Sequence, residues 1–142
     1  NNYLYKLRLN IYKTGLFDKH KTSAQELISH LKAKKNILLL CDQREFKGIN
    51  IPFLGKTAAT MTVPAVIALK TGAKIYAIKV TREKKVSYKY DFIEIPITKN
   101  GDKNNNIKTI MNDINNIYSE WIIESPENWL WTHKRWIKQE NK

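Results

Sequence analysis

The feature that most constrains the fold is a short apolar run that ends abruptly in polar side chains. Residues 37–41 read Ile-Leu-Leu-Leu-Cys, and Asp42 and Gln43 follow directly. A continuous apolar run of this length is typical of a strand buried on both faces of a sheet. In open α/β sheets, ligands bind beyond the carboxyl ends of such strands. Two interpretations remain open: the strand delivers Asp42 and Gln43 to a site, or it continues into an ordinary connection.

The segments that follow this run predict an α/β fold. Residues 42–55 contain two glycines and a proline and are expected to form a loop. A helix is expected from about Thr60 or Thr62 to Gly72, and a strand over residues 74–80. A strand, a short helix and a second strand in this order favour a right-handed parallel crossover. We therefore predict a mixed, mostly parallel central sheet flanked by helices.

Helices are also expected near both ends of the chain. An N-terminal helix is closed by Gly15, and a capping box over residues 23–26 starts a second helix. The clearest helix covers residues 106–124, where apolar residues trace one face. Between the central elements and that helix, residues 86–97 are expected to be extended, with a bulge near Phe92 that reconciles their two apolar parities.

Composition bounds the possible functions. The 142 residues are expected to form a single domain over 1–142, and the one cysteine, Cys41, allows neither an internal disulfide nor a cysteine-based metal cluster. The net charge of +12 favours a polyanion, which leaves nucleic acid, an anionic membrane face or a phosphorylated substrate open. The simpler interpretation is a solvated surface, because the lysines are spread along the whole sequence.

The C-terminal tail, residues 126–136, concentrates aromatic and basic side chains. If the tail is extended, Trp129, Trp131, His133 and Arg135 fall on one face. Such a face can stack on a ligand or line a boundary between polar and apolar regions. The alternative is a set of core aromatic residues with a basic edge in solvent.

A search for acid–base chemistry finds little. The histidines are His20, His30 and His133, and the first two are expected at the surface beside the second helix. The sequence has no Gly-rich phosphate loop and no Gly-x-Ser-x-Gly nucleophile elbow. We therefore predict no catalytic residue and no metal ligand within this sequence.

Five segments, taken in order, resemble the lipid A biosynthesis acyltransferase family, the late lauroyl and myristoyl transferases. They are Asn-Asn-Tyr-Leu at residues 1–4 leading to Arg8, the apolar run ending in Asp42-Gln43, residues 48–60, Lys-Thr-Gly-Ala at residues 70–73, and the tail at 126–136. The resemblance implies a glycerolipid-acyltransferase-like fold and a location on the cytoplasmic face of the bacterial inner membrane.

The resemblance also implies an activity. The family transfers a fatty acyl group from acyl carrier protein to a hydroxyl of a phosphorylated lipid A precursor, and the only implied cofactor is the acyl carrier protein thioester. A His-x4-Asp/Glu dyad supplies the general base, and no histidine here has an acidic residue at that spacing. In the family this dyad precedes the Asn-Asn-Tyr-Leu segment. The sequence is therefore interpreted as the C-terminal part of the acyltransferase domain, incomplete at its N-terminus and inactive alone.

Roles for individual residues follow from the resemblance. Arg8 is expected to bind a phosphate or to position the acceptor, and Asp42 to pair with Arg8 or to contact the sugar. Residues 51–54, Ile-Pro-Phe-Leu, form an apolar wedge expected against an acyl chain or the membrane. The full set of predicted substrate-binding residues is Arg8, Asp42, Gln43, His133 and Arg135, and for the last two a purely structural role is the alternative. The expected partners are acyl carrier protein, a phosphorylated lipid A precursor and an anionic membrane surface.

Two other classes of protein are alternatives. A basic α/β module that binds nucleic acid rests only on the net charge and the tryptophans, and its affinity would fall steeply with salt. A related glycerolipid acyltransferase fits less well, because the Asp-Gln block and the Trp-rich tail argue against it. We expect no nucleic-acid partner.

The interpretation as a part of a domain predicts poor solubility of the isolated chain. A sheet without its first strands exposes an edge and apolar surface, and such edges aggregate. Size-exclusion chromatography and a thermal melt check this expectation. A monomer that melts in one sharp, cooperative transition would contradict it.

Overall fold

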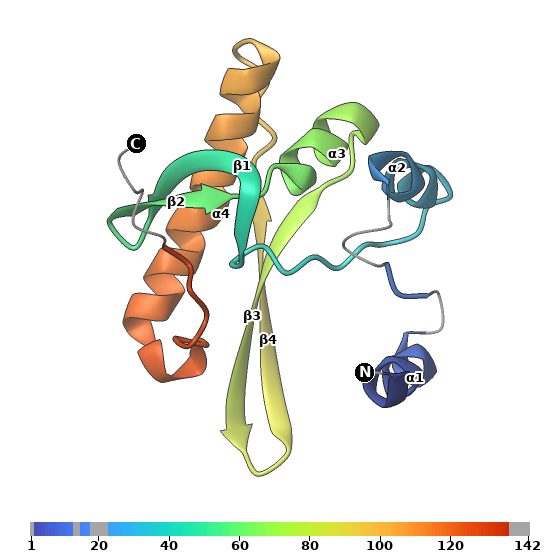
Figure 1. Cartoon of the computed structure of the whole chain (residues 1–142), viewed down its shortest axis with the longest axis vertical. Coiled ribbons are helices and arrows are strands. Elements are labelled where there is room, and N and C mark those ends of the chain that lie inside the picture. Colours follow the sequence, from blue (N-terminus) through green and yellow to red (C-terminus); the bar gives the residue numbers. More distant parts are fainter. Residues whose placement is uncertain (1, 13–14, 18–22, 137–142) are drawn as a thin grey trace.

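The computed structural model describes residues 2–12, 15–17 and 23–136 (Figure 1). His20, predicted at the surface, lies outside these residues. The elements in chain order are α1 (Asn2–Ile11), α2 (Ala24–Lys32), β1 (Arg44–Phe53), β2 (Lys56–Thr60), α3 (Val63–Thr71), β3 (Ile75–Lys84), β4 (Ser87–Ile95), α4 (Lys103–Glu124) and the short 3-10 helix η1 (Pro126–Asn128).

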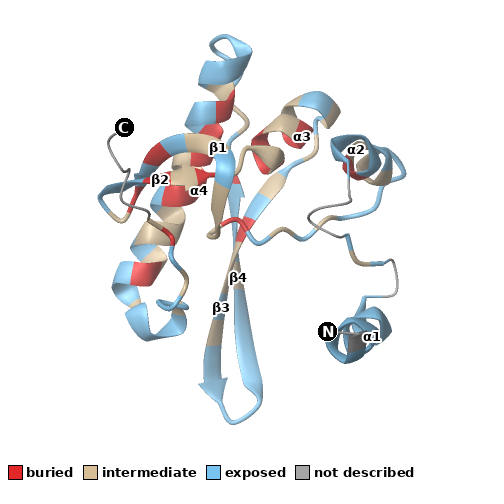
Figure 2. Ribbon diagram, in the orientation of Figure 1, coloured by how far each residue is buried: buried red, intermediate tan, exposed pale blue. Residues whose placement is uncertain are grey.

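The long helix α4 organises the core. Asp102 caps it by accepting hydrogen bonds from the backbone N–H groups of Asn104 and Asn105. Apolar residues at helical spacing form its buried face, as predicted, and the buried members are Ile107, Ile110, Met111, Ile114 and Ile122. This face packs against β1, α3 and the near ends of β3 and β4. The buried residues therefore gather along α4 (Figure 2).

The α/β class is confirmed, but the predicted mostly parallel central sheet is wrong for the part of the chain that the structure describes. The strands form two separate antiparallel pairs, β1 with β2 and β3 with β4. Strands joined by two-residue turns pair antiparallel, whereas a parallel pair needs a long crossover. The short connections in this sequence therefore produce hairpins.

The apolar run at residues 37–41 is not a strand in this structure. It makes no ladder with any described strand, and its side chains alternate between outside and inside. Leu38 and Leu40 are 64% and 67% exposed, while Cys41 is buried in the core. The predicted parallel crossover fails with it, because its first strand is missing.

Residues 42–55, predicted as a loop, instead form β1 and the turn into β2. Leu54 and Gly55 both have positive φ, at 49° and 72°, as a two-residue type I′ turn requires. Arg44 and Ile49 both align with Thr60, so the residues between them bulge out of the ladder. Gly48 lies in this bulge, directly against the backbone of Thr60.

The second hairpin is long and regular. β3 and β4 pair without interruption from Ile75 opposite Ile95 to Arg82 opposite Tyr88. The strand predicted over residues 74–80 is confirmed, but the predicted bulge near Phe92 is wrong. Because the pairing is regular, the apolar residues of the two parities lie on opposite faces of the hairpin. The aromatic residues of one face remain exposed. Figure 2 shows most of this hairpin as exposed.

The smaller helices follow their predicted signals. Ser23 and Glu26 form the capping box of α2, with the Ser23 N–H donating to Glu26 at 2.7 Å. α3 begins after Thr62 and ends at Gly72, whose φ of 74° is the left-handed conformation that glycine favours. The apolar side chains that α1 carries are exposed.

One polar contact fixes the first hairpin on α4. Asn115 is buried at the centre of α4, and its side-chain amide donates to the carbonyl of Pro52 at 2.8 Å and to the hydroxyl of Thr60 at 3.3 Å. The Thr60 hydroxyl in turn donates to the carbonyl of Ala58. Since buried polar groups are costly when unpaired, these bonds select one position of the hairpin across the helix.

The bulge in β1 predicts a steric test. A Cβ atom added at Gly48 would lie 2.1 Å from the carbonyl oxygen of Thr60, which is backbone and cannot move without breaking the pairing. Gly48→Ala is therefore expected to lower the free energy of unfolding by about 2 kcal/mol or more. Urea unfolding measures the change, with Gly101→Ala as control because its Cβ would meet nothing closer than 3.3 Å. Equal effects of the two substitutions would contradict the prediction.

Candidate functional site

The C-terminal tail packs against the turn of the first hairpin. Phe53 contacts two tryptophans, with ring centroids 5.7 Å from Trp129 and 5.8 Å from Trp136, and those two rings are themselves 5.8 Å apart. Trp131 stands edge-on to Trp129 at 4.8 Å and is half-exposed. Trp129 and Trp136 are partly buried and pack against the cluster that contains Phe53. For these two side chains the structure fits the interpretation of the tail as core aromatic residues.

Each of these indoles donates a hydrogen bond. The N–H of Trp136 donates to the carbonyl of Phe53 at 3.2 Å, and that of Trp131 to the carbonyl of Pro126. The N–H of Trp129 donates to Oδ2 of Asp42 at 2.9 Å. Indole groups that are partly buried usually find such partners, and here one of them is the predicted site carboxylate.

Asp42 is therefore held from across the chain. It is only partly buried, and among the described residues no hydrogen bond to its other oxygen is found. The negative charge of Asp42 affects its neighbour Cys41. Burial is the larger cause, and the charge of Asp42 the smaller, of a rise in the pKa of the Cys41 thiol to about 12. Burial first, then Cys41 and Asp42, also raises the pKa of Tyr118. The carboxylate thus sits at the edge of the core with one oxygen anchored.

Arg135 lies in the core rather than at a surface site. Its side chain is fully buried, and it donates to the carbonyl of Ala59 at 2.6 Å and to the hydroxyl of Thr60 at 2.7 Å. Its guanidinium also lies 4.7 Å from the ring centroid of Phe53. Burial lowers the pKa of Arg135 and the charge of Asp42 acts against that shift. Substrate binding by Arg135 stays a prediction, and this burial disfavours it.

His133 is brought to the start of β1. Its Nε2 accepts a hydrogen bond from the backbone N–H of Arg44 at 3.1 Å, so the proton of the neutral ring is on Nδ1. The Arg44 guanidinium lies over the ring of Phe46 at 4.0 Å. His133 and Asp42 are therefore both tied to the junction where the apolar run enters β1.

The structure does not gather all five predicted residues. Arg8 is exposed on α1, and no ion pair joins it to Asp42 among the ion pairs of the described residues. Gln43 is partly buried beside Asp42. Asp42, Gln43, His133 and Arg135 converge on one end of the first hairpin, and Arg8 does not join them.

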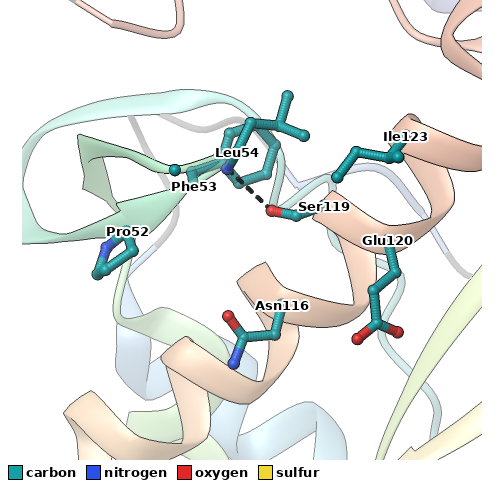
Figure 3. A pocket seen from close by; sticks show the side chains of 8 residues that line it. Pro52, Phe53, Leu54, Asn116, Ser119, Glu120 and Ile123 are labelled. Carbon is teal, nitrogen blue, oxygen red and sulfur yellow. Dashed lines mark hydrogen bonds between the residues drawn. The ribbon is translucent and has the colours of Figure 1, made fainter.

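Two hollows flank the hairpin. The first, about 250 Å³, lies between the β1–β2 turn and α4, where Ser119 accepts a hydrogen bond from the N–H of Leu54 (Figure 3). Pro52 and Leu54 of the predicted apolar wedge line it, whereas Ile51 is buried in the core. The second, about 440 Å³, lies at the start of α4 and has Lys47 and Lys108 in its wall.

Comparison with protein families decides the assignment. The family model described as bacterial lipid A biosynthesis acyltransferase matches residues 2–138. The chain belongs to this family. No curated protein matches it. The lipid A acyltransferase match covers all five of the segments that carried the resemblance, apart from Asn1.

The candidate site is formed by Asp42, Gln43 and His133 around the start of β1. Within residues 2–12, 15–17 and 23–136, no group of three or more histidine, cysteine or acidic side chains could hold a metal ion. None of the helices in those ranges is both long and apolar enough to span a bilayer. Asp42 is the polar group best placed to meet a ligand, because its carboxylate is anchored and partly open.

The sequence does not reveal the residues that hold the first hairpin, α4 and the tail together. The sequence indicates Thr60 only as a possible helix start, and Asn115 only as part of a helix. Neither residue carries a local signal, because Thr60 and Asn115 bond to each other across 55 residues of the chain. The tail pattern and the family resemblance place Arg135 among the substrate-binding residues, whereas the structure buries it and pairs it with the Ala59 carbonyl and the Thr60 hydroxyl.

The burial of Arg135 predicts a large effect on stability. Arg135→Met fills a similar volume but leaves the Ala59 carbonyl without its donor and removes a donor from the Thr60 hydroxyl. The free energy of unfolding is expected to fall by about 2–4 kcal/mol. Chemical unfolding measures it, with Lys134→Met at the exposed neighbour as control. Unchanged stability of Arg135→Met would show that the tail is not held by this side chain.

Proposed function

We propose that this chain forms the acceptor side of an enzyme that transfers a fatty acyl group from acyl carrier protein to a hydroxyl of a phosphorylated lipid A precursor. Membership of the lipid A acyltransferase family carries the proposal, since it matches residues 2–138 and supports acyl transfer in lipid A biosynthesis. The donor, the acceptor hydroxyl, and a position at the cytoplasmic face of the inner membrane are parts of the proposal.

In this proposal Asp42 binds the acceptor. Its Oδ2 is held by the indole N–H of Trp129, which leaves the second oxygen to accept a hydrogen bond from a sugar hydroxyl. Anchoring one oxygen fixes the direction of the other, which is how a binding group is oriented before the ligand arrives. Gln43, beside it, supplies an amide that can donate and accept.

Charge supports an anionic acceptor. The hollow at the start of α4 has Lys47 and Lys108 in its wall together with amide side chains, and no acidic residue lines it. Arg8 stands in solvent and is free to bind a phosphate by a paired hydrogen bond. The net charge of +12 points the same way.

Asp42 provides the test of this proposal, measured in the enzyme that carries this sequence. Asp42→Asn keeps an oxygen for Trp129 but removes the charge, and Asp42→Ala removes both. Each is expected to cut transfer of labelled acyl groups from acyl carrier protein to the lipid A precursor by roughly tenfold or more, the value of a charged hydrogen bond. Arg8→Ala is expected to reduce transfer similarly.

Asp113→Asn on α4 is the matched control and is expected to leave transfer unchanged. The thermal melt of Asp42→Asn should match that of the wild type, because the bond to Trp129 is retained. Wild-type transfer in both Asp42 variants and in Arg8→Ala would overturn the assignment of these residues. Absence of transfer in the wild type with this donor and acceptor would overturn the proposed reaction.

A further inference from the structure

The second hairpin carries an apolar face that the core does not use. The register of β3 and β4 places directly opposed residues on the same side of the ribbon. One side enters the core through Ala77 and Ile95, which are buried. The other side carries six apolar side chains, called the aromatic face below: Tyr76, Ile78, Val80, Tyr88, Tyr90 and Phe92.

The aromatic face is exposed along its length. Phe92 is 62% exposed and Tyr90 58%, and only Ile78 is intermediate. The usual pattern of a hairpin, apolar toward the core and polar toward solvent, is reversed in the outer half. There the core-side positions are polar, namely Lys79, Thr81, Lys89 and Asp91, while the outward positions are apolar except for Arg82. A contiguous apolar patch of this kind marks an interaction surface.

The end of the hairpin is basic. The segment from Arg82 to Lys89 contains four cationic side chains and one acidic one, Glu83. Lys89 is paired with Asp91 at 3.0 Å, and the Arg82 Nε donates to the carbonyl of Lys85. Lys84 ends β3, and the two turn residues are Lys85 and Val86, of which Val86 is 90% exposed. The hairpin points away from α3 and the start of α4 (Figure 1).

We propose that the aromatic face and the basic turn of the β3–β4 hairpin bind the surface of an anionic lipid bilayer. Tyrosine rings favour the boundary between head groups and acyl chains because one end of each ring is polar. Each lysine near an anionic membrane surface adds to the attraction. Charge complementarity selects this occupant, since an apolar face alone would fit any apolar partner. A lipid substrate makes such a contact useful, so this inference deepens the proposed function and rests on it.

Nucleic acid fits the same surface less well. Binding of single strands uses rings interleaved with cations along a groove that follows the phosphates. Here the cations are gathered at the turn, and the face itself adds the aliphatic side chains Ile78 and Val80. An acyl-chain boundary accommodates aliphatic and aromatic groups equally.

Vesicle flotation tests the proposal in the enzyme that carries this sequence, because bound protein rises with the vesicles while aggregated protein sinks. The vesicles are phosphatidylcholine alone or an equal mixture with phosphatidylglycerol. The wild type is expected to float with the mixture, and Lys84→Glu/Lys85→Glu to bind it at least roughly tenfold more weakly. Tyr90→Ser/Phe92→Ser is expected to bind more weakly to the same degree, and far-UV circular dichroism reports whether it still folds.

Lys99→Glu/Lys103→Glu is the matched control, with the same charge change at and just before the start of α4, the end of the molecule away from the turn (Figure 1). It is expected to float like the wild type. A second measurement does not depend on any loss of binding: an environment-sensitive dye on Val86→Cys should shift to the blue with anionic vesicles, whereas the dye on Thr109→Cys should not. Cys41 is buried and its pKa is raised to about 12, so it stays unlabelled near neutral pH.

Several outcomes would overturn the proposal. They are a wild type that does not float, equal loss of flotation in the α4 control and the turn variant, an unshifted dye at Val86, and binding to a single-stranded oligonucleotide that the turn variant loses while vesicle binding is unaffected. None of these measurements involves acyl transfer. The hairpin contact and the proposed reaction therefore succeed or fail separately.

Discussion

One buried oxygen joins the parts of this molecule that are far apart in sequence. The hydroxyl of Thr60 accepts hydrogen bonds from Asn115 on α4 and from Arg135 in the tail, and donates to Ala58 within its own strand. The carbonyl of Thr60 is also the atom against which Gly48 packs. Helix, hairpin and tail thus meet at one residue. Because an unpaired polar group in the core is costly, each of these elements depends on the others being in place.

The tail transmits this arrangement to the candidate site. Once Arg135 fixes the tail on the hairpin, Trp129 reaches Asp42 and His133 reaches the N–H of Arg44. The tail thereby orients Asp42, the proposed binding group, through contacts within the protein. Arg135 and His133, both predicted to bind substrate, thus hold the tail and the start of β1 next to Asp42, the residue proposed to bind the acceptor.

The sequence predicted local features well and long-range pairing poorly. The capping box at Ser23, the left-handed Gly72 and the apolar face of α4 each depend on residues within one or two turns, and all three were confirmed. The β1–β2 hairpin was missed because Leu54-Gly55 lacks the Asn-Gly signal of a type I′ turn. Residues 37–41 matched a buried strand by composition, but a strand also needs a neighbour, which composition cannot supply. The family resemblance survived these errors, since it rested on the order of motifs rather than on the sheet.

The long register of β3 and β4 sets a gradient of local stability along the hairpin. Its near end is held by Ala77 and Ile95 in the core and by the ion pair of Lys79 with Glu124. Beyond Val80 the residues up to Tyr90 are exposed except for Thr81, and an isolated two-stranded ribbon is marginal in water. The outer half will therefore open and close without disturbing α4, as a unit of lower stability than the rest. A partner that binds this outer half would therefore also order it.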